Sequence, residues 1–130
     1  MKNGVMSTIV SLLLLLFLTF HLAGDIVYGW EPGGLANLIV VVLISVVWLY
    51  GTLVLAERRS GYVIILLGSL GGSAVPVIHM MGAGLVGGRI ANSAGVFFWV
   101  WTLIALGVTA IFSVILSARG LWSLQWGQSR

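Results

Sequence analysis

The sequence predicts an all-α integral membrane protein, a single-domain bundle of four transmembrane helices with both termini on the cytoplasmic side. The 130 residues are 60% hydrophobic and only 7% charged, whereas a soluble domain carries about a quarter charged residues. Four apolar stretches contain no Asp, Glu, Lys or Arg. Each has about the 20 residues that a helix needs to cross the hydrocarbon core.

The first expected helix covers residues 5–24 and follows Lys2. A cleaved signal peptide can begin in the same way. This apolar run is long for one, and His21 would occupy a cleavage-site position that requires a small residue. We therefore expect the segment to stay in the protein as a membrane span.

The second and third expected helices cover residues 34–56 and 61–81. Only the four residues 57–60 separate them, which predicts a tight antiparallel hairpin. The second helix follows Glu31 and Pro32, a carboxylate and a proline of the kind found at helix starts.

The fourth expected helix covers residues 94–118 and is followed by a short interfacial tail, residues 119–130. In the tail, Trp122 and Trp126 are four residues apart and would share one helix face. The Gly-rich loop before this helix matches GxGxxG at Gly82–Gly87. It follows a membrane helix rather than a strand, so we expect no nucleotide partner.

The basic residues set the orientation. Threading four helices places Lys2, Arg58, Arg59, Arg119 and Arg130 on one side and only Arg89 on the other. The positive-inside rule then predicts a multi-pass protein of a cell inner membrane with cytoplasmic termini. Because these residues flank apolar runs and do not form one basic face, we expect the lipid bilayer as a partner and no nucleic acid.

Each helix has one stripe of small, hydroxyl or polar residues that predicts its inward face. The stripes are Ser7, Ser11, Leu18, His21 and Asp25; Asn37, Val41, Ser45, Trp48 and Thr52; Gly68, Gly72, Pro76 and His79; and Gly95, Thr102, Thr109, Ser113 and Ser117.

Aromatic residues near the ends of the helices predict the two interfacial belts of the membrane. The expected inner-belt residues are Tyr50 and Tyr62, and the expected outer-belt residues are Tyr28, Trp30, Phe97, Phe98 and Trp99.

The candidate site consists of His21, Asp25 and His79. His21 and Asp25 are four residues apart and share a helix face. Counting about 1.5 Å per residue from the inner ends, His21 lies about 24 Å and His79 about 26 Å along their helices. Both histidines should therefore lie at the same depth near the outer face, where Glu31 and Arg89 are further polar residues.

Three interpretations of this cluster are open. His21 and His79 could bind haem b axially. Alternatively, His21, Asp25 and His79 could bind a metal ion, with Glu31 as a further oxygen ligand and with Met80 and Met81 favouring copper. In the third interpretation the side chains form structural hydrogen bonds, and Asp25 pairs with His21 or Arg89.

The sequence has no cysteine and no recognisable nucleophile–base pair or HExxH motif, so we expect no enzyme activity. The leading functional hypothesis is a small non-catalytic accessory or scaffolding subunit of a membrane complex, or a homo-oligomer. One alternative is a haem- or metal-binding redox protein that uses His21 and His79. The other is a small transporter or channel with a polar path lined by Ser11, Ser45, Thr102 and Thr109.

Overall fold

The computed structural model describes residues 2–29, 34–81 and 94–127, and in these ranges the fold is all-α. The helices are α1 (Lys2–Val27), α2 (Gly34–Leu53), α3 (Arg59–Met81) and α4 (Ala94–Gly127). All four are long and apolar enough to cross a membrane. The expected class, a bundle of four candidate membrane spans, is confirmed.

Several helix boundaries differ from the expectation. α1 begins three residues early, at Lys2, and ends three residues late, at Val27. α2 ends at Leu53, three residues early, and α3 begins at Arg59, two residues early. The connection between them is held by main-chain bonds such as Arg58 N–H to the Leu55 carbonyl, 3.0 Å. It also contains Glu57 at a left-handed φ of 62°. The tight hairpin is therefore present, but its turn is made by residues 54–58.

α4 continues through the expected end at residue 118 to Gly127. The first of the extra turns still packs on α3. Gly120 is buried, and the Tyr62 ring lies where a side chain at Gly120 would have to be. Tyr62 is therefore a packing residue at the end of the bundle that holds the α2–α3 connection, not the belt aromatic that we expected. The interfacial position of the tail stays a prediction.

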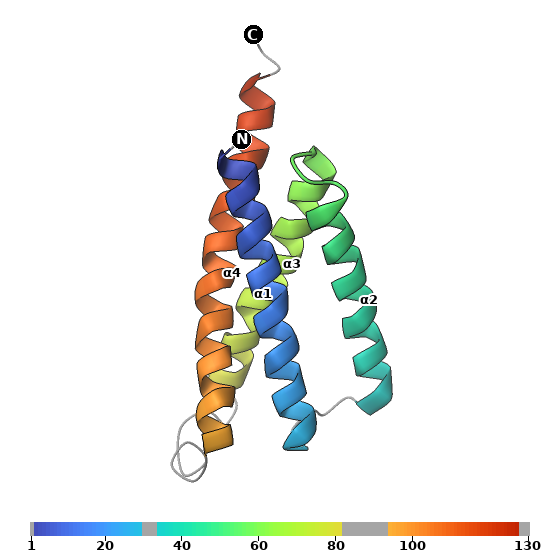
Figure 1. Ribbon diagram of the computed structural model, residues 1–130, viewed down its shortest axis with the longest axis vertical. Coiled ribbons are helices and arrows are strands. Elements are labelled where there is room, and N and C mark those ends of the chain that lie inside the picture. Colours follow the sequence, from blue (N-terminus) through green and yellow to red (C-terminus); the bar gives the residue numbers. More distant parts are fainter. Residues whose placement is uncertain (1, 30–33, 82–93, 128–130) are drawn as a thin grey trace.

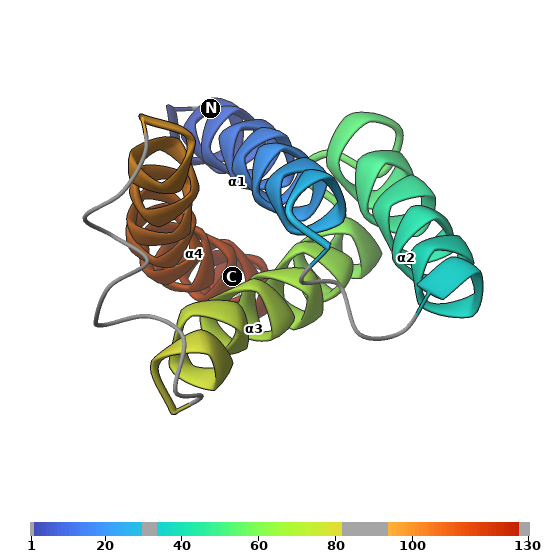
Figure 2. The same ribbon diagram turned by 90° about the horizontal axis from the view of Figure 1, so that it is seen from below.

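Three helices form the body of the bundle, and α2 lies at its edge. α1, α3 and α4 pack around a common axis, whereas α2 meets the others near the α2–α3 connection and diverges from them toward its other end (Figures 1 and 2). The buried residues of α2 are Trp48, Gly51 and Thr52, all in its last two turns. The first helical turns of α2 are therefore open to the surroundings.

The expected inward stripes largely coincide with the core. Buried polar residues of these stripes are Ser7, Ser11, His21, Asp25, Thr52, Thr102, Ser113 and Ser117. Asn37 is the exception, because the start of α2 stands away from the bundle and leaves this residue exposed. The apolar core consists of Leu14, Leu15, Trp48, Ile65, Leu106 and Ala110.

Hydrogen bonds between buried hydroxyl groups link the helices. Ser11 Oγ lies 2.8 Å from Thr52 Oγ1 and accepts a bond from Trp48 Nε1 at 2.9 Å. Ser69 Oγ donates to Ser113 Oγ at 2.6 Å. Such bonds contribute to helix association in lipid, where the hydrophobic effect between helices is absent.

The four hydroxyl residues of the proposed channel path do not form one group. Ser45 and Thr109 donate to carbonyls of their own helices. Leu14 and Leu106, both fully buried, occupy the core between the level of Ser11 and that of Thr102. Water moving along these hydroxyls would have to cross this apolar layer.

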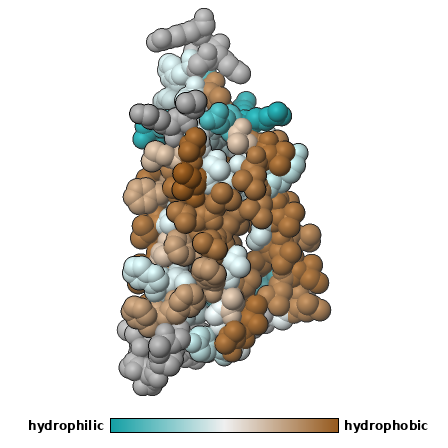
Figure 3. All heavy atoms as spheres, viewed as in Figure 1, coloured by the Kyte–Doolittle hydropathy of each residue, from teal (hydrophilic) through white to brown (hydrophobic). Residues whose placement is uncertain are grey.

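The outer surface matches a lipid environment. Apolar side chains cover the middle of the bundle, and hydrophilic residues gather toward the end that holds the α2–α3 connection (Figure 3). Large apolar residues such as Val42, Leu67 and Ile111 are more than half exposed. Since water would make this exposure unfavourable, the distribution supports a membrane location.

Candidate metal centre at one end of the bundle

The predicted site residues come together at the end of the bundle opposite the α2–α3 connection. His21 and Asp25 lie one turn apart in the last turns of α1, and His79 lies in the last turn of α3. Because α1 and α3 run in the same direction, these two helix ends lie at the same end of the bundle (Figure 1).

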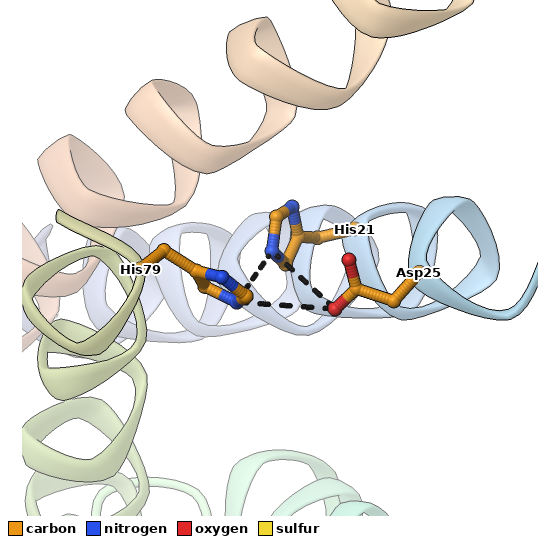
Figure 4. Close-up of side chains that lie close together, drawn as sticks. All are labelled: His21, Asp25 and His79. Carbon is orange, nitrogen blue, oxygen red and sulfur yellow. Dashed lines mark hydrogen bonds and ion pairs between the residues drawn. The ribbon is translucent and has the colours of Figure 1, made fainter. Parts of the chain in front are cut away.

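Three potential ligand atoms face one another in this cluster (Figure 4). His21 Nε2 lies 3.2 Å from His79 Nε2. Asp25 Oδ2 lies 3.7 Å from His21 Nε2 and 3.8 Å from His79 Nε2. The two imidazoles meet edge to face, with ring centroids 4.9 Å apart. Without an ion, one Nε2 donates its proton to the other.

Trp99 of α4 completes the cluster, and sequence reasoning missed it. Its Nε1–H donates to Asp25 Oδ1, and its ring lies 4.9 Å from the His21 ring and 5.2 Å from the His79 ring, centroid to centroid. At 4% exposure, Trp99 is a buried residue and not an outer-belt one. A side chain at Gly24 would press on the Trp99 ring, so this glycine allows the approach.

A signal for Trp99 was present in the sequence. The inward stripe of α4 includes Thr102, and a step of three residues toward the helix start reaches Trp99. The belt rule assigned Trp99 to the headgroup layer only because it lies near the end of a span.

The Asp25 carboxylate is buried, with 8% of the residue exposed. In the described segments, the two imidazoles alone lie within ion-pair distance of it. A buried carboxylate requires a positive partner, because taking an unpaired charge out of water is very unfavourable. A metal ion at the Nε2 atoms, or a proton on one ring, supplies that charge.

The geometry fits a single metal ion. A triangle with sides of 3.2, 3.7 and 3.8 Å has a centre about 2.1 Å from each corner. Zinc binds His nitrogen at about 2.0–2.1 Å and carboxylate oxygen at about 2.0–2.2 Å. His21 Nε2, Asp25 Oδ2 and His79 Nε2 can therefore coordinate one ion with little rearrangement. Two imidazoles and one carboxylate suit zinc or copper(II).

The same geometry does not fit a haem. Axial ligation by two histidines requires their nitrogens on opposite faces of a porphyrin, with the iron between them. Here the two Nε2 atoms are 3.2 Å apart and both face Asp25, so a porphyrin ring has no space between the imidazoles.

The other sequence-predicted site residues are not placed. Glu31 and Arg89 lie outside the described residues, as do the side chains of Met80 and Met81. Metal binding by the Glu31 carboxylate and by the methionine sulfurs, and pairing of the Arg89 guanidinium with Asp25, therefore stay predictions.

No protein-family model matches the chain, and no curated protein sequence or solved structure matches it either.

Proposed function

We propose that this chain is a small membrane protein that binds one divalent transition-metal ion through His21, Asp25 and His79. One observation supports the proposal. An ion at the centre of the ligand triangle would lie about 2.1 Å from His21 Nε2, Asp25 Oδ2 and His79 Nε2, a distance typical of zinc ligation. The clustering of these ligand atoms adds to it, since His21 and Asp25 are buried and His79 is partly buried.

The three side chains would leave one side of the ion open. Sites with three protein ligands and a free position bind water or an exchangeable ligand there, whereas structural zinc sites have four protein ligands. The His79 side chain is 29% exposed, against 2% for His21, so the ion would enter and exchange from the His79 side. Trp99 would fix the orientation of the Asp25 carboxylate from the buried side.

Metal binding is tested on protein purified without a polyhistidine tag. Equilibrium dialysis against zinc or copper(II), followed by elemental analysis, should find one ion per chain. His79→Gln and Asp25→Asn each remove a ligand, so affinity should fall by more than the ~100-fold that outer ligand contacts contribute.

Thr19→Val is the matched control for these variants. Thr19 is an exposed hydroxyl residue of α1 whose Oγ1 donates to the Leu15 carbonyl, so its loss should leave metal affinity unchanged. If the wild type binds neither ion above the level of His79→Gln, the cluster holds a proton and not a metal, and the proposal fails.

We also propose that both termini face the cytoplasm from the inner membrane. Five of the six Lys and Arg residues lie on the side of the termini in this arrangement, as the positive-inside rule requires. Because the chain lacks cysteine, single-cysteine variants report the orientation. In intact cells an impermeant thiol reagent should label Val27→Cys but not Ser123→Cys, and the reverse pattern would exclude this orientation.

An accessory or scaffolding role, or self-association, is a second proposal, which the exposed outward face of α2 favours. Val42, Val46 and Leu53 on this face are each more than half exposed, so another membrane helix could pack there. Oxidation of Val46→Cys in native membranes should give a disulfide-linked dimer or a complex with a partner. Ile104→Cys on α4, equally exposed, is the control. Only monomer from both variants would contradict the proposal.

A further inference from the structure

A pocket of about 290 Å³ lies between the α2–α3 connection and the last turns of α4. Its lining comes from two segments far apart in the sequence. The residues are Glu57, Arg58, Arg59, Leu121, Leu124 and Gln125. Because α3 and α4 run in opposite directions (Figure 1), the packing of Tyr62 against Gly120 brings the residues before Tyr62 level with those after Gly120. The fold, and neither segment alone, therefore forms the pocket.

Two positive charges in this pocket have no carboxylate partner. Arg58 and Arg59 are exposed, and within the described segments neither forms an ion pair. The one acidic residue of the lining, Glu57, has its carboxyl group against Gly4 in the first turn of α1, where the helix dipole favours a negative charge. The two guanidinium groups can therefore bind an anion from outside the chain.

The rest of the lining suits a phosphate group that carries an apolar part. Guanidinium groups form paired hydrogen bonds with phosphate oxygens, and the side-chain amide of Gln125 is a further donor. Arg59 is the first residue of α3, and the start of a helix favours a negative charge. Leu121 and Leu124, both partly buried, form an apolar side of the same pocket.

The position of the pocket along the bundle matches the level of lipid headgroups. Its α4 residues lie beyond Arg119, on the same turns as Trp122 and Trp126. Both of these tryptophan side chains are exposed, and tryptophan favours the headgroup layer of a membrane. The phosphate of a lipid beside the bundle would therefore lie level with Arg58 and Arg59.

We propose that this pocket binds the phosphate of one anionic phospholipid, with Arg58 and Arg59 as its charge partners. Leu121 and Leu124 contact the apolar part of the same lipid next to its headgroup. A zwitterionic lipid carries a positive group of its own, so two arginines select for net negative charge. Inorganic phosphate has the same oxygens but offers the two leucines no contact. The site is independent of the metal cluster at the other end of the bundle.

The test uses protein reconstituted in an equal mixture of phosphatidylglycerol and phosphatidylcholine, extracted in detergent and weighed intact by native mass spectrometry. One phosphatidylglycerol per chain should remain, with a preference of about 30-fold, which corresponds to about 1 kcal/mol for each arginine. Arg58→Gln and Arg59→Gln should each lower this preference about 5-fold. Arg119→Gln removes the same charge from an exposed arginine outside the lining and should keep the preference.

Steric filling and free phosphate test the pocket itself. Gln125→Trp should abolish the preference, whereas Ser123→Trp, at an exposed residue of α4 outside the lining, should keep it. Equal elution of the two variants by size shows that both fold. Excess inorganic phosphate should not displace the lipid, and displacement would assign the pocket to soluble phosphate and overturn the proposal. Equal retention of both lipids by the wild type overturns it too, as does an unchanged preference in Arg59→Gln or Gln125→Trp.

Discussion

Trp99 acts on the candidate metal centre through the carboxylate and not through the ion. Its Nε1–H binds Asp25 Oδ1, which leaves Oδ2 directed at the two histidines. Residues that hydrogen-bond a metal ligand fix its orientation, and their loss lowers metal affinity by about 10–100-fold.

Trp99→Phe should therefore weaken zinc binding by about 10–100-fold, because it removes the donor and keeps most of the ring. Isothermal titration of the purified protein measures the change. Trp101→Phe is the control, since Trp101 is 56% exposed on the same helix and should bind zinc as the wild type does. Equal affinities of the two variants would show that Trp99 only fills space.

Glu57 has a backbone conformation that favours glycine. Its φ is 62°, a left-handed value that is unfavourable for a residue with a Cβ by about 1 kcal/mol or more. Its carboxyl group lies against Gly4 in the first turn of α1, where the helix dipole favours a negative charge. The carboxylate offsets part of the backbone strain.

Two substitutions at Glu57 separate these effects. Glu57→Ala loses the carboxylate and keeps the strain, so its free energy of unfolding should fall. Glu57→Gly also loses the carboxylate but relieves the backbone, and it should be more stable than Glu57→Ala by about 1 kcal/mol. Unfolding by SDS in mixed micelles measures both. The opposite order would mean that the turn tolerates the left-handed φ without strain.

At the scale of the helices, α2 is attached to α1 through one buried polar group. Ser11 Oγ contacts Thr52 Oγ1 and accepts from Trp48 Nε1. Ser11→Ala leaves the Trp48 donor without this acceptor, and the free energy of unfolding should fall by about 1 kcal/mol, within the range of interhelical bonds in membranes.

The control for this bond is Ser45→Ala. Ser45 donates only to the Val41 carbonyl of its own helix, so its removal should change the free energy of unfolding by much less. The same micelle titration compares the two variants, and equal losses would mean that the Ser11 bond adds nothing between helices.

At the scale of the whole molecule, a bound ion would join α1 to α3 at the end of the bundle opposite the α2–α3 connection. An ion that binds only the folded state adds about 2.7 kcal/mol at a concentration 100 times its dissociation constant. Zinc should therefore raise the thermal unfolding midpoint of the wild type. In His79→Gln the midpoint should not move, and an equal rise there would place the ion elsewhere.

The sequence predicted the number and type of the helices because hydropathy and length are properties of each span alone. It also predicted that His21 and His79 share a depth, since helix rise converts residue number to height. It did not predict Trp99 in the cluster or Tyr62 beneath Gly120, because both depend on how one helix rotates against another. The divergence of α2 likewise arises only from the packing of all four helices.

The unequal lengths of α2 and α4 have a consequence for the surrounding bilayer. At 1.5 Å per residue, the 20 residues of α2 extend about 30 Å and the 34 residues of α4 about 51 Å. The exposed and stacked rings of Trp122 and Trp126 favour the headgroup layer far along α4. The turns of α4 past Arg119 should therefore project beyond the hydrocarbon core, so that α2 and the apolar part of α4 can cross a bilayer of one thickness while the end of α4 reaches past the headgroups.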